Sequence, residues 1–217
     1  MKNLTFKQCT VGLLERTLGI EQIHHSDTLN QWLNYEINIT ESERENLLEQ
    51  QEVLIFNLLG WNEQELALNF IGPVVSMLRF KSKKFNLFAE RSIEATLTTV
   101  DGSELALNGK PDGIIASGFR EPEMPFFSFH EHKQELDSSG DPAGQVLAAM
   151  LVGQAQNKNP ELPMYGCYII GQNWYFLVLE NKNYAIASPF SATNKELFDI
   201  FRILKALKAI VEKRIND

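Results

Sequence analysis

The stretch Lys110–Lys133, KPDGIIASGFREPEMPFFSFHEHK, decides how we interpret this chain. Charged residues stand at its two ends, with Asp112 in Lys110-Pro-Asp-Gly113 and the pair Glu131 and Lys133 in Glu131-His-Lys133. The residues between them are mostly apolar, β-branched or aromatic, which is typical of strands. We therefore expect two neighbouring strands that carry a carboxylate and a carboxylate–ammonium pair to one place.

Alternation along a strand over residues 125–133 predicts how its side chains divide. Residues two apart emerge on the same face, so Glu131 and Lys133 are expected together. Phe127 and Phe129 precede them on the same face, and the opposite face carries Ser128, His130 and His132. Because aromatic residues share the face of the charged pair, we expect that pair to enter a partly buried cleft, where unpaired charge is costly.

Asp112, Glu131 and Lys133 are the residue types that phosphodiester hydrolysis requires. Carboxylates can hold a divalent cation that activates water, and a cation offsets the charge that grows on the phosphate. Pro111 fixes its own φ and Gly113 permits a sharp bend, so Asp112 is expected where a strand is distorted. The three residues are our candidate catalytic site.

The flanking sequence predicts an α/β fold in which a mixed central sheet is flanked by helices. We expect one compact domain, with a helical or irregular N-terminal extension over 1–60 packed on a core over 61–217. Capping boxes predict helix starts at Thr40–Glu43 and Thr193–Glu196, and Asp141-Pro142 predicts a third. Helices are expected over 43–59, 62–77 with a kink at Pro73, 141–156 and 195–214. Strands are expected over 91–100, 105–116 and 125–133 as a meander, and over 165–170, 174–179 and 184–187.

The order of elements and the motif together resemble the PD-(D/E)xK nuclease superfamily, whose fold is restriction-endonuclease-like. Pro111-Asp112 stands about twenty residues before Glu131-His132-Lys133. The family core is a helix, three antiparallel strands, a helix and a further strand, here about residues 62–179. The resemblance implies that Asp112 and Glu131 bind Mg²⁺ or Mn²⁺. It implies that Lys133 orients the water or stabilises the transition state.

The resemblance also implies roles for residues outside that stretch. Many members add a carboxylate from the first core helix, for which Glu65 is the better candidate and Glu63 the reserve. Some branches add a glutamine after the third strand, where Gln145 stands, followed four residues later by a tyrosine that is Ala149 here. The implied reaction is DNA cleavage that leaves 5′-phosphate and 3′-hydroxyl ends.

The basic cluster comprises Arg79, Lys81, Lys83 and Lys84 and could contact the phosphate backbone, although such clusters are usually solvated loops.

Composition limits the classes of function. The chain has 217 residues with 20 Lys and Arg against 28 Asp and Glu, giving a net charge of −8. This argues against a general nucleic-acid coat protein, so a nuclease must use metal ions, local cations or a partner. Cys9 and Cys167 are far apart and are expected to be structural thiols. We expect a soluble cytoplasmic protein without a membrane partner, and a homodimer or protein partner is left open.

Each candidate site residue also has a simpler, purely structural interpretation. Asp112 could be a turn residue, Glu131 and Lys133 an exposed ion pair, and Glu65 a carboxylate that complements a helix dipole. A second Glu-x-Lys, at Glu180–Lys182, is expected to lie in a hairpin turn. Two alternative functions remain at this point. One is a catalytically inactive nuclease-like binding or assembly module, and the other is a zinc hydrolase that uses His130 and His132.

Overall fold

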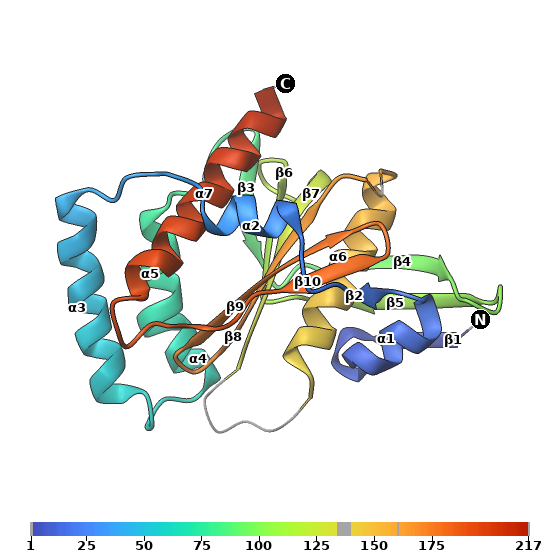
Figure 1. The fold of residues 1–217 in the computed structure, drawn as a ribbon, viewed down its shortest axis with the longest axis horizontal. Helices are drawn as coiled ribbons and strands as arrows, with labels where there is room; N and C mark the ends of the chain where they lie inside the picture. Colours follow the sequence, from blue (N-terminus) through green and yellow to red (C-terminus); the bar gives the residue numbers. More distant parts are fainter. Residues whose placement is uncertain (1, 134–139, 160, 217) are drawn as a thin grey trace.

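The computed structural model describes residues 2–133, 140–159 and 161–216 as a mixed α/β fold (Figure 1). In chain order the elements are β1 (Lys2–Thr5), the 3₁₀-helix η1 (Phe6–Gln8), α1 (Val11–Leu18), β2 (Glu21–Gln22), α2 (Asp27–Leu33), α3 (Glu41–Asn57), α4 (Glu63–Leu66), the π-helical turn η2 (Ala67–Ile71), α5 (Gly72–Met77), β3 (Phe85–Ala89), β4 (Ile93–Thr98), β5 (Glu104–Gly109), β6 (Gly113–Ser117), β7 (Glu123–Lys133), α6 (Pro142–Asn157), β8 (Met164–Ile170), β9 (Asn173–Glu180), β10 (Asn183–Ile186), β11 (Phe190–Ser191) and α7 (Leu197–Asn216). Among these helices none has both the length and the apolar character needed to cross a bilayer.

The larger sheet is mixed, as the sequence predicts. Its strands lie in the order β2-β10-β9-β8-β7-β6-β3, and β11 pairs with β9. The pairs β7–β8 and β2–β10 are parallel, and the other pairs along the sheet are antiparallel. Helix α6 connects β7 to β8, because parallel neighbours need a crossover long enough to return the chain to the same end. A separate three-stranded sheet has the order β1-β5-β4.

Helices cover both faces of the larger sheet, and each face has its own apolar core (Figure 1). On one face α2, α3, α5 and α7 bury residues such as Trp32, Leu54 and Phe201. On the other, α1, α6 and the small sheet bury residues such as Leu147 and Leu107. The first 60 residues contribute to both sheets, since β1 pairs with β5 and β2 with β10. The expected boundary at residue 60 stays a prediction.

The prediction of a single strand over 105–116 is wrong, because strand pairing is interrupted at residues 110–112. The break leaves β5 in the small sheet and starts β6 in the large one. Pro111 is buried and has no N–H to donate to a strand ladder, which explains why pairing stops there. The expected meander is therefore wrong as well. The three consecutive antiparallel strands of the large sheet are β3, β6 and β7, while β4 and β5 form a hairpin of the other sheet.

A bulge in β7 changes which aromatic side chains share a face. Ser128 pairs with Ile115 while Phe126 pairs with Ala116, so β7 has one extra residue at Phe127. Phe127 packs in the core beneath α2, α3 and α7, whereas Phe129 packs in the core beneath α6. The prediction that these two phenylalanines share a face is wrong. Phe129 lies directly under Gly153 of α6, where a Cβ would approach its ring to 2.5 Å.

The helix expected over 62–77 forms, with an irregular middle. The backbone N–H of Gly72 donates to the carbonyl of Ala67, five residues earlier, which is the π-helical pattern. Pro73 follows immediately and has no N–H to continue the ladder. A widened turn before a proline avoids the clash that a regular helix would suffer. Glu63 stands at the start of this segment, in the first turn of α4.

Two of the three expected helix starts are confirmed. Thr40 and Glu43 form a capping box on α3, and the Asp141 side chain accepts the N–H of Gly144 at the start of α6. The third is wrong. The Glu196 carboxylate accepts the backbone N–H of Ser191, and α7 begins at Leu197.

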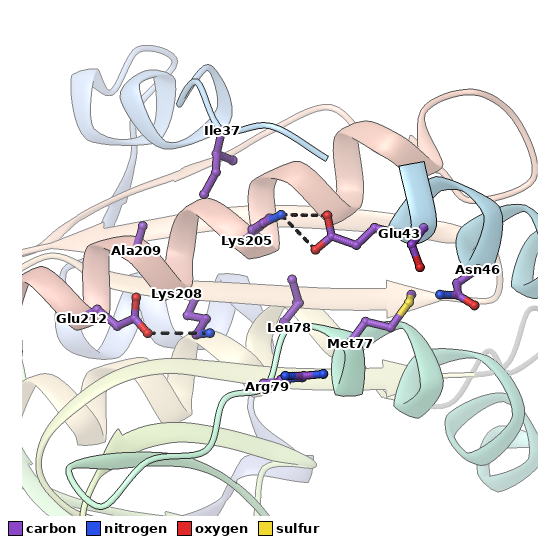
Figure 2. A pocket seen from close by; sticks show the side chains of 11 residues that line it. Ile37, Glu43, Asn46, Met77, Leu78, Arg79, Lys205, Lys208, Ala209 and Glu212 are labelled. Atoms are coloured by element: carbon purple, nitrogen blue, oxygen red, sulfur yellow. Dashed lines mark hydrogen bonds and ion pairs between the residues drawn. The ribbon is translucent and has the colours of Figure 1, made fainter. Parts of the chain in front are cut away.

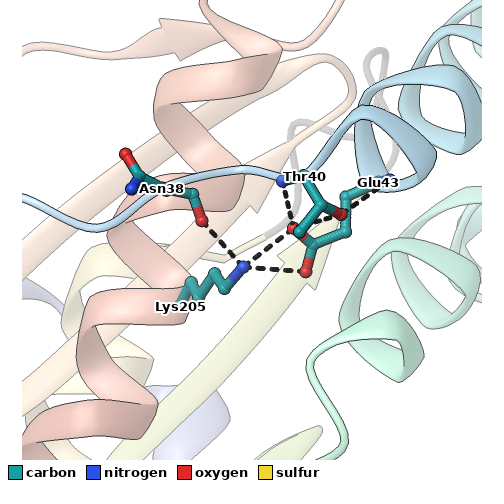
Figure 3. Close-up of polar contacts among 4 residues, drawn as sticks. All are labelled: Asn38, Thr40, Glu43 and Lys205. Carbon is teal, nitrogen blue, oxygen red and sulfur yellow. Dashed lines mark hydrogen bonds and ion pairs between the residues drawn. The ribbon is translucent and has the colours of Figure 1, made fainter.

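An ion pair joins the start of α3 to the middle of α7 (Figure 3). Lys205 Nζ lies 2.8 Å from Glu43 Oε2 and also donates to the backbone oxygen of Asn38. Burial alone would raise the pKa of Glu43, but hydrogen bonds from Lys205 and Thr40 lower it below its ordinary value. One carboxylate therefore both caps α3 and connects it to α7.

We predict that Glu43→Ala lowers the free energy of unfolding by about 1–2 kcal/mol, because it removes a helix cap and leaves Lys205 without its carboxylate partner. Urea unfolding at pH 7 measures this change. The matched control is Glu45→Ala, two residues along α3 on an exposed side chain, expected to change stability by less than about 0.5 kcal/mol. Equal effects of the two substitutions would contradict the assigned role.

Candidate metal-binding site

The candidate site lies where β6 begins and β7 ends. Gly113, the first residue of β6, pairs with His130 of β7, so Asp112 lies beside the last residues of β7. The first turn of α4 brings Glu63 to the same place, where its carboxylate contacts Lys133. Three segments separated in sequence therefore meet at one end of the strands.

Three ion pairs organise the site, and two of them share Lys133. Asp112 Oδ2 accepts the backbone N–H of His132 at 2.8 Å and lies 3.0 Å from His132 Nδ1. Lys133 Nζ donates to Glu63 Oε2 at 3.0 Å and lies 3.7 Å from Glu131 Oε1. Three carboxylates thus surround one lysine and one histidine. The expectation that Asp112, Glu131 and Lys133 come together agrees with this arrangement.

Burial makes the Glu131–Lys133 pair unusual. Their side chains are 8% and 11% exposed, which excludes the simpler interpretation of an exposed surface pair. Burial, and then the neighbouring Asp112 carboxylate, raises the pKa of Glu131 to about 7, although Lys133 and His132 oppose the rise. Burial alone would lower the pKa of Lys133, but its hydrogen bond to Glu63 and the nearby carboxylates raise it. Lys133 therefore carries its charge at neutral pH.

Asp112 and His132 influence each other in the same way. Burial would raise the pKa of Asp112, yet the hydrogen bond and positive charge of His132 lower it. Burial would lower the pKa of His132, yet the hydrogen bond to Asp112 and the surrounding carboxylates raise it. The site therefore holds ionised Asp112 and favours a positive charge next to it.

The residues fit a divalent cation. Glu63, Asp112 and His132 each offer one ligand atom, and these atoms lie within 4.8 Å of one another. Ligands about 2.1 Å from an octahedral ion lie at most about 4.2 Å apart, so side-chain adjustments of about half an ångström close the set. Glu131 is the fourth candidate ligand, because the same Lys133 links it to Glu63.

Glu63 occupies the position that the sequence assigned to Glu65. Glu65 is exposed, and its Oε2 accepts the backbone N–H of Asn62 at 2.8 Å as the third residue of a capping box. That role turns its carboxylate toward the helix start, so the choice of Glu65 over Glu63 is corrected. The pattern Asn62-x-x-Glu65 is itself a capping signature and could have identified this role.

Gln145 and His130 are not members of the ligand group found among the described residues. Gln145 is buried in the first turn of α6, and among the described residues no hydrogen bond joins it to Asp112, Glu131 or Lys133. His130 is buried, its Nε2 lies 3.4 Å from Ser128 Oγ, and burial lowers its pKa to about 4. In the part of the chain that the structure describes, His132 joins a ligand group and His130 does not.

The basic cluster lies at the far end of the same strands. Lys84 directly precedes β3, whose first residue pairs with Ser117, whereas Asp112 directly precedes β6 at the opposite end. Five paired residues separate the two ends, which is roughly 15 Å. Lys84 Nζ donates to the side chain of Asn216 at the end of α7. The cluster is therefore a separate surface and not part of the candidate site.

Arg79 of this cluster also lines a groove of about 480 Å³ between α3, α5 and α7 (Figure 2). Two ion pairs cross or border the groove, Lys205 with Glu43 and Lys208 with Glu212. None of its lining residues belongs to the Glu63–Asp112–His132 group. Because the lining cations other than Arg79 are paired, the groove does not present a strongly charged surface.

The second Glu-x-Lys lies in a turn, as expected. Glu180 ends β9 and Asn183 begins β10, so Lys182 is between the two strands. Glu180 Oε1 accepts a hydrogen bond from Thr28 Oγ1 at 2.7 Å. The backbone oxygen of Lys182 accepts the N–H of Glu21 at the start of β2, and Glu180 is not part of the ligand group found among the described residues, so this copy serves below as a matched control.

Comparison with known proteins adds no assignment. No protein-family model matches the chain, and no curated protein matches it. The proposals below therefore depend on the geometry and chemistry of the residues.

We predict that Glu131→Gln stabilises the protein at pH 8 in the presence of a chelator, by on the order of 2 kcal/mol. The pKa of the folded carboxyl, about 7, lies above its ordinary value of 4.5. The folded state therefore holds more protons between these values, and the stability that the neutral acid supplies is lost as pH rises through 7. Thermal unfolding of both proteins at pH 5 and pH 8 measures the difference.

The control for this prediction is Glu49→Gln on the exposed surface of α3. It removes one negative charge without removing a buried one. The two glutamine variants should behave alike at pH 5 and differ at pH 8. An unchanged stability difference between wild type and Glu131→Gln across this range would contradict the pKa assignment.

Proposed function

We propose that this chain is a metal-dependent nuclease of the PD-(D/E)xK class that hydrolyses phosphodiester bonds in DNA. The observation that carries the proposal is the meeting of Asp112, Glu131 and Lys133 at one strand end, with Glu63 from the preceding helix. Burying a lysine among three carboxylates costs free energy, so stability alone does not explain this arrangement. A function that needs these charges does. A divalent cation and a phosphate together would supply the charges that complete this arrangement.

The order of elements supports the restriction-endonuclease-like assignment. Helical segment α4–α5 precedes antiparallel β3, β6 and β7, then α6 crosses over to β8, which is parallel to β7. This is the order that the resemblance implies, with the β4–β5 hairpin inserted between the first two strands. Asp112 then directly precedes the second strand, and the Glu131–Lys133 pair stands at the end of the third, in the order of the motif.

Each residue has a defined task in the proposed hydrolysis. A bound Mg²⁺ or Mn²⁺ supplies Lewis acidity and lowers the pKa of water. Asp112 and Glu63 would hold this ion, and Glu131 would add a third carboxylate beside it. Lys133 keeps its charge and is placed to donate to the attacking water or to a phosphate oxygen. The water oxygen bonds to phosphorus and gives up a proton, while the bond from phosphorus to O3′ breaks and O3′ takes up a proton, so one water is consumed and the ends are a 5′-phosphate and a 3′-hydroxyl.

A second candidate function, an assembly or binding module without catalysis, is favoured by an apolar surface. Helix α3 and the segments after it leave several large apolar side chains exposed, with Phe56, Leu59 and Leu68 each at least 75% exposed. Such patches on a surface often mark contacts with other proteins. The acidic net charge is also compatible with a protein partner. An assay of metal-dependent DNA cleavage distinguishes this function from catalysis.

We predict that the wild-type chain cleaves labelled DNA when Mg²⁺ or Mn²⁺ is present, and that Asp112→Asn and Lys133→Met reduce the rate at least about 100-fold. Gel analysis of single- and double-stranded substrates measures cleavage, and circular dichroism verifies folding. The matched control is Lys182→Met, which removes the lysine of the second Glu-x-Lys and should retain the wild-type rate. A folded wild-type protein that cuts neither substrate with either ion supports the assembly module instead.

We further predict that the basic cluster contributes electrostatically to DNA binding. Changing Lys81 and Lys83 to Gln together should lower affinity for a 20-base-pair duplex and reduce the salt dependence, log Kd against log salt, by roughly one for each lysine that contacts phosphate. The assay is fluorescence anisotropy with Ca²⁺ to slow cleavage. Changing exposed Lys2 and Lys7 to Gln makes the same change in net charge and is the control. Identical slopes for the two double variants would show that the cluster is only solvated.

A further inference from the structure

We propose that the imidazole of His132 is a ligand of the bound ion, together with Glu63 and Asp112, so that the site binds a transition-metal dication such as Mn²⁺ more tightly than Mg²⁺. This inference rests on the proposed function for the presence of an ion, and it deepens that function by naming the ion's class. Neither the sequence motif nor the family resemblance assigns a role to His132.

The distance between His132 and Asp112 is the first support. His132 Nδ1 and Asp112 Oδ2 lie 3.0 Å apart. Two adjacent ligands about 2.1 Å from an octahedral ion are separated by about 3.0 Å, so both atoms can bind one ion with little movement. One ligand atom from each of Glu63, Asp112 and His132 lies within 4.8 Å of the other two. The three residues therefore occupy one side of a coordination sphere.

The backbone fixes the position of this pair. The N–H of His132 donates to Asp112 Oδ2 at 2.8 Å, which orients the carboxylate before any ion arrives. Asp112 directly precedes β6, and the N–H belongs to paired strand β7. A ligand that is already oriented loses less conformational entropy on binding.

Glu131 supplies a second, independent observation. Its side chain is 8% exposed, and among the described residues its carboxylate has no hydrogen-bond donor, with Lys133 Nζ at 3.7 Å as its ionic neighbour. A buried carboxylate without donors is costly. A dication bound beside Glu131 would offset this cost.

The type of ligand determines which dication is preferred. Mg²⁺ favours oxygen ligands and retains its waters, whereas imidazole nitrogen suits transition metals. One nitrogen beside two carboxylates therefore favours Mn²⁺ and the ions that follow it in the series of increasing affinity over Mg²⁺. Mn²⁺ is the suitable probe because it accepts carboxylate oxygen as well and is paramagnetic.

The test combines spectroscopy with calorimetry on the whole chain. Pulsed electron paramagnetic resonance of the Mn²⁺ complex should show modulation from one directly bound ¹⁴N, and this signal should disappear in His132→Asn. Calorimetric titration should give a Kd for Mn²⁺ at least about tenfold below that for Mg²⁺ in wild type, and a ratio near one in His132→Asn. The nitrogen signal is measured on wild type, so it does not depend on the folding of a variant.

His130→Asn is the matched control, because His130 lies two residues away on β7 and outside the ligand group. It should retain both the nitrogen signal and the ratio of affinities. Mn²⁺ bound without nitrogen modulation, or no Mn²⁺ bound at millimolar concentration, overturns the inference. Ion-dependent DNA cleavage is measured separately, so cleavage without a nitrogen signal refutes the ligand role alone. A nitrogen signal without cleavage refutes the nuclease alone.

Discussion

The inability of Pro111 to pair in a strand determines where the rest of the site is built. A strand that continued from Glu104 to Ser117 would keep Asp112 inside a ladder, paired with a neighbour. The break instead sends the preceding residues to one sheet and the following ones to another. Asp112 is then left at the strand end, where its carboxylate accepts a backbone N–H from β7. The same residue that interrupts the sheet thereby positions a candidate ligand.

Charge concentrated at this strand end conflicts with the apolar packing around it. Phe127 and Phe129, only two to four residues before Glu131, pack in cores on opposite faces of the sheet. Glu131 and Lys133 follow them into a region where water is largely excluded. Ion pairs in such places rarely stabilise a fold more than apolar residues would. The cluster is therefore more simply explained by chemistry that needs it than by stability.

The sequence predicted the parts of this arrangement that depend on local rules. Proline and glycine predicted a distortion at Asp112, although not a break into two strands, and capping residues predicted the starts of α3 and α6. It failed where the outcome depends on tertiary pairing. Alternation could not detect the extra residue at Phe127, nor could it show that 104–109 pairs with the N-terminal strand. Glu63 and Glu65 are the same residue type in the same helical turn, so composition does not show which one reaches the site. In the structure Glu65 accepts the N–H of Asn62, and Glu63 contacts Lys133.

His132 illustrates why a motif written as Glu-x-Lys hides information. Alternation places the middle residue on the opposite strand face from its neighbours, and this argues against a shared role. In the structure, however, the His132 imidazole lies 3.0 Å from the Asp112 carboxylate, which directly precedes the neighbouring strand β6. For an acidic chain that must approach a polyanion, a ligand that strengthens the hold on a dication without adding negative charge is an electrostatic advantage over a fourth carboxylate.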